Sequence, residues 1–258
     1  MISHIFHRQT GLLIRQLSTA LTLTLSIFLC ADAGTARAAT LVDDFSSTIN
    51  TVPFPFRQVQ QTGVGSNSGA PPVETGLTGV IGGSRQTTVG VTAGVATARA
   101  RIFAGSPGSL QYTSSGVSSN LTLNYNNNGA GLGANINPFL GVSIPFGNVA
   151  LGGAPSLPVT ATITDAAANV ATAVVAITTE GAQTLIIPAG AFAGLGALDL
   201  SNVSSIQFMF DAGLGQEFTL RGPIQLLTPE PLAILGWSVV LMIGLAGWRY
   251  LGPRLRAA

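Results

Sequence analysis

Hydrophobic and polar residues alternate along the central part of the chain with a period of two, the pattern of β-strands that cover a core with one face. Residues 121–126 show it most clearly, with Leu, Leu and Tyr on one face and Thr and Asn on the other. Residues 159–164 alternate likewise, and residues 170–178 return after a short loop, which predicts an antiparallel hairpin. A second hairpin is expected from residues 206–210 and 218–221. Further strands are expected near residues 41–45, 86–92, 95–103, 110–113, 140–144 and 185–188.

Glycine-rich segments separate these expected strands. Residues 62–79 and 126–133 combine glycine with Asn, Ser or Pro and are expected to be loops. Residues 189–198 are the one candidate helix, and their three glycines argue against it. About ten to twelve short strands at this spacing predict an all-β fold, a jelly-roll-like antiparallel β-sandwich. We expect this domain to span residues 39–226.

The end of the chain follows a different pattern. Residues 232–248 contain no ionisable side chain and are long enough to cross a bilayer as one helix, with Trp237 and Trp248 toward its two ends. Arg249, Arg254 and Arg256 form a basic tail, residues 249–258, which the positive-inside rule places in the cytoplasm. The preceding domain is therefore expected outside the inner membrane, in the periplasm, with a single membrane span.

The motif Pro229-Glu230-Pro231, the apolar helix and the basic tail together resemble the PEP-CTERM sorting signal of Gram-negative bacteria, over residues 227–258. This resemblance implies an exosortase as partner, which would recognise and process the signal. The helix would then be a temporary anchor, and the mature domain would reach the cell surface or the exopolysaccharide matrix. An ordinary C-terminal anchor behind a proline-rich linker is the alternative.

Residues 1–38 have the order of a signal peptide. His4, His7, Arg8 and Arg15 precede a largely apolar run over residues 17–30, and Ala36-Arg37-Ala38 supplies a small-x-small cleavage site. We therefore expect export by the Sec translocon and cleavage by signal peptidase after Ala38 or one residue later.

Composition narrows the chemistry of the mature domain. All eleven basic residues are arginine, and both histidines and the single cysteine lie within the expected signal peptide. Without His, Cys or Lys the mature domain has no Ser-His-Asp or Cys-His pair, no imidazole or thiolate zinc site and no disulfide. Between residues 39 and 227 five arginines face eight acidic residues, so no basic patch for nucleic acid is expected.

The body of the chain carries a second resemblance. Residues 41–45 (LVDDF), 81–85 (IGGSR) and 199–206 (DLSNVSSI) are similar to segments of secreted PEP-CTERM proteins with a jelly roll like that of carbohydrate-binding modules. This resemblance favours a jelly roll over other sandwiches.

Asp43, Asp44, Asp211 and Glu217 are the acidic residues most suited to meet, because the first and last strands of a jelly roll often pair. Oxygen ligands suit Ca²⁺, so these four form a candidate metal site, with no other cofactor expected. The alternative is that Asp43 and Asp44 are solvated strand-edge charges partnered by Arg221 or Arg85.

Candidate carbohydrate contacts are few, because both tryptophans belong to the membrane helix. Tyr125 with Asn124 and Asn126 could form a polar aromatic rim, although Tyr125 fits a core position equally well. Arg99 and Arg101 share one strand face and could contact an acidic sugar, or form a solvent-facing row against edge aggregation. Alternation assigns the remaining aromatic candidates to the core: Phe45, Phe103, Phe208, Phe210 and Phe218.

Together these features predict a surface-sorted, non-enzymatic structural or interaction protein of the extracellular matrix. A carbohydrate-binding module for exopolysaccharide is the alternative. A glycoside hydrolase based on two carboxylates is a third interpretation, because that chemistry needs no histidine.

Overall fold

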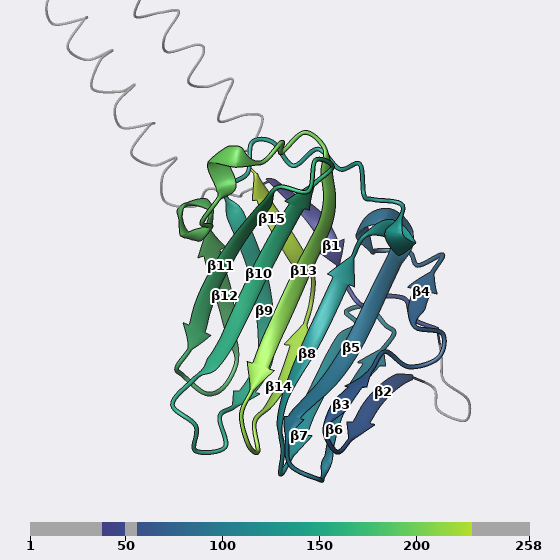
Figure 1. Ribbon diagram of the computed structural model, residues 1–258, viewed down its shortest axis with the longest axis vertical. Helices are drawn as coiled ribbons and strands as arrows, with labels where there is room; N and C mark the ends of the chain where they lie inside the picture. Colours follow the sequence, from purple (N-terminus) through teal and green to yellow (C-terminus); the bar gives the residue numbers. More distant parts are fainter. Residues whose placement is uncertain (1–37, 50–55, 229–258) are drawn as a thin grey trace, which may run out of the picture. The chain divides into compact units, whose positions relative to one another are not determined.

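The computed structural model describes residues 38–49 and 56–228, the coloured part of Figure 1. The expected signal peptide, except for its last residue Ala38, and the sorting motif, membrane helix and basic tail lie outside these residues and stay predictions. Within the described part of the chain, no helix has the length and apolar character needed to cross a membrane.

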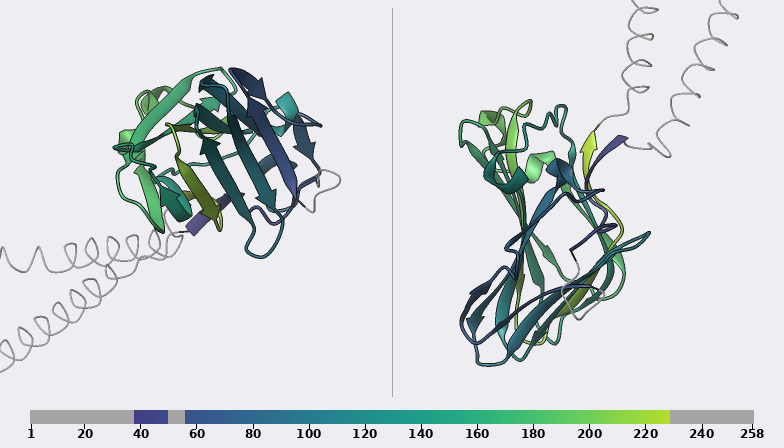
Figure 2. Two further views of the ribbon diagram at one scale, coloured as in Figure 1. Left: turned by 90° about the horizontal axis from the view of Figure 1, so that it is seen from below. Right: turned by 90° about the vertical axis from the view of Figure 1, so that its right-hand side faces the viewer.

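Fifteen strands form two antiparallel sheets that pack face to face, as the edge-on view in Figure 2 shows. The eight-stranded sheet contains β1 (Ala38–Asp43), β2 (Arg57–Thr62), β6 (Thr97–Phe103), β7 (Ser109–Ser115), β9 (Gly141–Ala150), β12 (Gln183–Pro188), β14 (Glu217–Arg221) and β15 (Ile224–Thr228). The seven-stranded sheet contains β3 (Gly65–Asn67), β4 (Val73–Thr75), β5 (Ser84–Ala93), β8 (Ser118–Tyr125), β10 (Leu157–Asp165), β11 (Val170–Ile177) and β13 (Val203–Ala212). The all-β sandwich expected from the alternation is thus confirmed, with more strands than expected.

Four strands were not expected, namely β2, β3, β4 and β15, and of these only β3 and β4 lie where the sequence indicated a loop. The glycine-rich stretch 62–79 holds β3 and β4, each three residues long, which pair with β5. Side-chain alternation cannot be read over so few residues. The candidate helix at 189–198 is instead two short 3₁₀ turns, Ala189–Ala191 and Leu195–Ala197.

One of the two expected hairpins forms. β10 and β11 pair in continuous register from Leu157↔Ile177 to Thr164↔Val170. β13 and β14, by contrast, belong to different sheets, so the second hairpin was wrong. The connection crosses the sandwich around the buried Gln216, whose Oε1 accepts from the Gly213 amide at 2.6 Å and whose Nε2 donates to the Ser156 carbonyl at 2.8 Å.

The first and last described strands lie side by side. β1 pairs with β15, and Ala38 is the register partner of Thr228. β14 and β15 follow one another along β9, from Glu217↔Ala150 to Leu227↔Gly141. On the side away from β9, β14 pairs with β7 and β15 pairs with β1.

Side chains that point inward from both sheets form the core. Its centre is aromatic: Phe210 and Phe218 have ring centroids 5.0 Å apart, and Tyr112 stacks on Phe218 at 5.0 Å. Such pairs add to the free energy gained by burying apolar area. Phe45, Phe208, Phe210 and Phe218 are buried as expected. Phe103 is only half-buried, because it points outward from β6.

Candidate functional site

A row of polar side chains crosses five strands on the outer face of the eight-stranded sheet. Strand pairing sets the neighbours: Gln58 on β2 opposes Arg101 on β6, and Arg101 opposes Gln111 on β7. Gln111 opposes Thr219 on β14, which opposes Asn148 on β9. We call these five residues the polar row. Neighbouring strands are about 4.8 Å apart, so the row is roughly 19 Å long.

Four members of the polar row alternate with buried strand neighbours and so point outward, and Asn148 lies beside the β-bulge residue Gly147. Tyr112 beside Gln111, and Phe218 and Leu220 beside Thr219, belong to the core. Gln111 and Asn148 are exposed, and the other three members are half-buried. Amide, guanidinium and hydroxyl groups are thereby presented in one line.

A second row runs beside the first. Gln60 opposes Arg99, Arg99 opposes Thr113, and Thr113 opposes Glu217. Because Arg99 and Arg101 are two residues apart, both point outward from β6, as the sequence predicted.

Two phenylalanine rings flank the end of the polar row. The Phe56 and Phe103 ring centroids are 4.9 Å apart at an interplanar angle of 45°. The Arg101 guanidinium lies 5.3 Å from the Phe56 ring centroid, and Arg101 Nε donates to Gln58 Oε1 at 3.1 Å. The Phe56 ring and the Gln58 amide hold this guanidinium in one orientation. This outer face therefore offers an apolar surface directly beside hydrogen-bonding groups.

A β-bulge positions a third arginine on the same face. Thr219 opposes Asn148 and Leu220 opposes Phe146, which leaves Gly147 of β9 without a partner in β14. A Cβ atom on Gly147 would lie 3.0 Å from the Cβ of Arg221. The absent side chain leaves space for Arg221 to lie over β9. We call the outer face of the eight-stranded sheet, with Arg99, Arg101 and Arg221, the arginine face.

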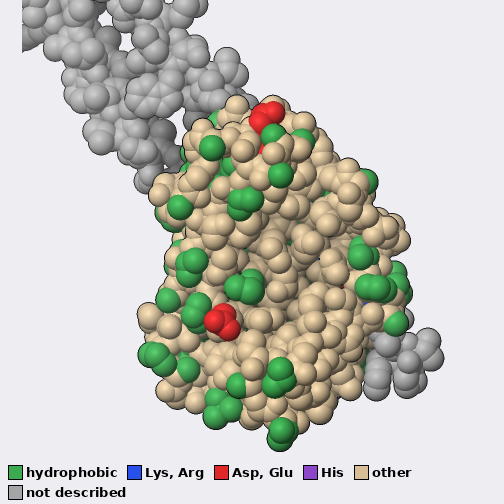
Figure 3. Space-filling model, viewed as in Figure 1, with side chains coloured by type: hydrophobic (Ala, Val, Ile, Leu, Met, Phe, Trp, Pro, Cys, Tyr) green, Lys and Arg blue, Asp and Glu red, His purple; other side chains and the backbone are tan. Residues whose placement is uncertain are grey.

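The outer face of the seven-stranded sheet is different in character. Threonine and amide side chains dominate it: Thr88, Thr122, Thr160, Thr162, Gln86, Asn120, Asn124 and Gln207. Figure 3 views this side of the molecule and shows no Lys or Arg. We call it the threonine face. It also carries the exposed Asp211, next to Asn120.

The carbohydrate contacts expected from sequence do not come together. Tyr125 is fully buried, so it is a core tyrosine and not part of a rim. Asn124 lies on the threonine face, opposite Gln207 and Gln86. Asn126 closes the turn after β8 by accepting from the Gly129 amide. Arg99 and Arg101 lie on the other sheet. The remaining members of the polar row were not predicted, because their alignment depends on strand register.

The four candidate calcium ligands are not gathered either. Within residues 38–49 and 56–228, no group of three or more acidic residues is arranged to hold a metal ion. Asp44 accepts from the Ser46 amide at 2.8 Å, while Asp211 and Glu217 lie on opposite sheets. Asp43 is fully buried and not a solvated edge charge, although Arg85 is its partner as the alternative proposed.

Asp43 belongs to a buried ionic cluster. Arg85 Nη1 donates to both Asp43 carboxylate oxygens, at 2.8 and 3.1 Å, and Arg85 Nε donates to Glu74 Oε2 at 3.0 Å. The Tyr125 hydroxyl donates to Asp43 Oδ2 at 2.9 Å. Arg57 Nε lies 3.5 Å from Glu74 Oε2. We call Asp43, Glu74, Arg57, Arg85 and Tyr125 the ionic cluster.

The ionic cluster holds segments of the chain together. Burial raises the pKa of the Asp43 carboxyl, and the charge of Arg85 limits that rise. Burial alone would lower the pKa of Arg85, but the charges of Asp43 and Glu74 raise it. Glu74 also accepts from the Thr48 hydroxyl and the Ile49 amide, which fixes the segment after β1. Both carboxylates are thus held by donors inside the protein, away from any outer face.

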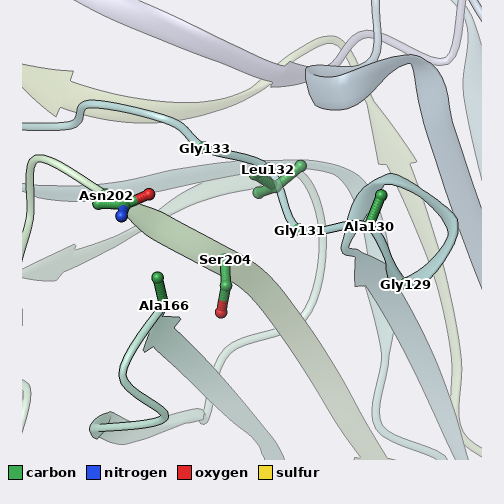
Figure 4. Close-up of a pocket in the computed structure, with 8 residues that line it drawn as sticks. All are labelled: Gly129, Ala130, Gly131, Leu132, Gly133, Ala166, Asn202 and Ser204. Carbon is green, nitrogen blue, oxygen red and sulfur yellow. The ribbon is translucent and has the colours of Figure 1, made fainter.

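A shallow pocket of about 380 Å³ lies at one end of the seven-stranded sheet. Gly129, Ala130, Gly131, Leu132 and Gly133 line it together with Ala166, Asn202 and Ser204, as Figure 4 shows. The Ser204 hydroxyl donates to the Thr164 and Asp165 carbonyls, so it serves the fold. The lining therefore offers a ligand only backbone groups and the amide side chain of Asn202, and it contains no acidic or basic side chain.

Comparisons with known proteins identify no family for the chain. No protein-family model and no curated protein matches it. Among solved structures, it is similar to the family 11 carbohydrate-binding module of Clostridium thermocellum in complex with a mixed-linked tetrasaccharide. The two are 17% identical over 75% of this chain and 98% of that one, with a TM-score of 0.38.

Two further solved structures show a similar degree of likeness. One is described as carbohydrate-binding modules of the β-sandwich superfamily, 8% identical over 76% of this chain and 62% of that one, TM-score 0.33. The other is the agarase AgWH50C, 11% identical over 74% of this chain and only 26% of the agarase, TM-score 0.35. Similarity at this level carries neither ligand nor activity over to this chain.

Proposed function

We propose that this protein is a non-enzymatic, polysaccharide-binding component of the extracellular matrix, and that the arginine face is its binding surface. The polar row is the observation that carries the proposal. Sugar hydroxyls both donate and accept hydrogen bonds, and a line of amide, guanidinium and hydroxyl groups can match several of them along an extended chain. The Phe56 and Phe103 rings provide the apolar contact that a sugar ring's C–H faces need.

Gln111 tests this proposal, because it lies at the centre of the polar row and is exposed. We expect Gln111→Ala to weaken binding of the full chain to a polysaccharide about three- to tenfold, the effect of one or two lost hydrogen bonds. Gln207→Ala removes the same side chain from the threonine face and is the matched control. Glycan-array and pull-down measurements check this. Equal loss for both variants, or for neither, would contradict binding by the arginine face.

The route to the matrix is a separate proposal that rests on residues outside the described part of the chain. Signal-peptide export, a transient helical anchor and exosortase processing at Pro229-Glu230-Pro231 would deliver the domain to the cell surface. We expect mass spectrometry of the surface-released protein to find a C-terminus close to Pro229. Retention of residues 232–248 in that fraction would contradict processing.

A further inference from the structure

We propose that the arginine face selects an acidic polysaccharide, with Arg99, Arg101 and Arg221 as the residues that bind its carboxylate or sulfate groups. This inference rests on the proposed function, and it adds the chemical class of the ligand.

Basic side chains at the domain surface are confined to one face. Of the five arginines in the domain, Arg57 and Arg85 are buried in the ionic cluster. The other three all lie on the arginine face: Arg99 and Arg101 on β6, and Arg221 on β14, with β7 between these two strands.

None of these three arginines forms an ion pair with an acidic residue in the described part of the chain. All ion pairs within residues 38–49 and 56–228 involve Arg57 or Arg85. Arg101 is held by Gln58 and Phe56, neither of which carries a charge. An arginine held in place without a carboxylate keeps its remaining N–H donors for an anionic ligand.

Spacing on the sheet suits a repeated anion rather than a single one. Arg99 and Arg101 are two residues apart on β6, about 7 Å along the strand. Arg221 opposes Ser109 of β7, which opposes Phe103, so it lies two strands away from β6, about 10 Å across the sheet. One small anion could not bridge all three positions, whereas a polymer with an acid on successive sugars could.

Glu217 is an acidic residue on this face, two strands from Arg99 across Thr113. Its charge opposes the field of the three arginines at one edge of the surface. An acidic ligand should therefore bind more tightly when this carboxylate is neutralised. Replacing Glu217 should thus raise the affinity, whereas replacing one of the arginines should lower it.

The experiment compares polymers that differ in charge alone. The full chain is titrated with polygalacturonate and with its fully methyl-esterified form, and in parallel with dextran sulfate and dextran. We expect at least tenfold tighter binding to the acidic member of a pair, falling as salt is raised. The first pair tests carboxylate and the second tests sulfate as the anionic group. Polyglutamate, an acidic polymer without sugar, is the third probe.

Variants on both faces then distinguish the loss of a binding charge from general damage to the fold. We expect Arg101→Gln and Arg221→Gln each to lower affinity for the acidic polymer about tenfold, the effect of one charge-assisted hydrogen bond. Arg221→Lys keeps the charge and should retain most of the binding. Glu217→Gln should raise affinity about twofold to threefold, the effect of one exposed like charge. Asp211→Asn removes an acid from the threonine face and should leave affinity unchanged.

The outcomes distinguish this inference from the proposed function. Equal affinity for charged and uncharged polymers, with loss on Gln111→Ala and none on Arg221→Gln, would overturn acid selection and keep polysaccharide binding. Binding to no sugar polymer would overturn both. Equal affinity for polyglutamate and polygalacturonate would overturn recognition of an acidic sugar, because charge alone would then suffice.

Discussion

Arg85 links three segments of the domain through one side chain. It binds Asp43 at the end of β1, Glu74 in β4 and the Ser47 carbonyl between them. All of the charged groups involved are excluded from water. Removing the guanidinium would leave the buried Asp43 carboxylate without a positive partner and Glu74 with Arg57 alone, which is far more costly than losing a surface ion pair.

Arg85→Met should therefore lower the free energy of unfolding by ~3–5 kcal/mol, measured by denaturant unfolding of the full chain. Arg221→Met, at an exposed position, is the matched control and should change it by less than ~0.5 kcal/mol. A loss below ~1 kcal/mol for Arg85→Met would show that the buried carboxylates find other donors or take up protons at little cost.

The sequence indicated Arg85 as one of two arginines that could form an ion pair with Asp43. It could not show that the pair is buried, because Leu41-Val42-Asp43-Asp44-Phe45 is compatible with either aspartate facing inward. Tyr125 illustrates the same limit. Alternation placed its side chain on the apolar face of the strand, and only the packing of β1 against that strand supplied Asp43 as the acceptor for its hydroxyl.

Asp165 connects three elements at the end of β10. Its carboxylate accepts from the Ala167 and Asn169 amides in the turn to β11, from the Asn169 side chain, and from the Asp199 amide in the segment before β13, at 2.9 to 3.0 Å. These donors, the Asp199 amide first, lower the pKa of Asp165 below its ordinary value near 3.8. The folded state thus favours the ionised form.

The stabilisation that ionised Asp165 gives the folded state is fully present above the ordinary pKa of the carboxyl. It is lost as the pH falls through the lowered pKa of the folded state. We expect Asp165→Asn to lower the melting temperature at pH 7, because the amide NH₂ group replaces one carboxylate oxygen and cannot accept the two hydrogen bonds made there. The difference from wild type should shrink as the pH is lowered through and below 3.8. A difference that stays constant over the acidic range would contradict the role of the charge, and Asp211→Asn provides an exposed control.

Strands of six or more residues were largely predictable, because each shows alternation over several positions. Their partners were predictable only in part: β10 and β11 pair as expected, but β13 and β14 do not. The hairpin expected between β13 and β14 failed since both strands alternate equally well whether they share a sheet or face one another. The chain crosses from one sheet to the other around the buried Gln216. Nothing in the sequence alone indicates that this polar residue is buried.

The whole domain has two outer faces of different chemistry on a common core. The sequence predicted the all-β class and the exclusion of His, Cys and Lys chemistry. It could not place the three surface arginines together, because that depends on the order β9-β14-β7-β6 in the sheet. The polar row follows from the same order, and so does the proposed ligand class.

The pairing of β1 with β15 also determines how the domain responds to force. A pull that separates the beginning of β1 from the end of β15 would load the β1–β15 hydrogen bonds one after another, as in a zipper, and such a geometry yields at low tension. A pull between Thr228 and a polymer held on the arginine face leaves β1 outside the line of tension. The load then passes through the long β9–β14–β15 contact, in which many hydrogen bonds share it at once. A matrix component held at one end and at its ligand would therefore be mechanically firm, while the same fold stretched between its two ends would open readily.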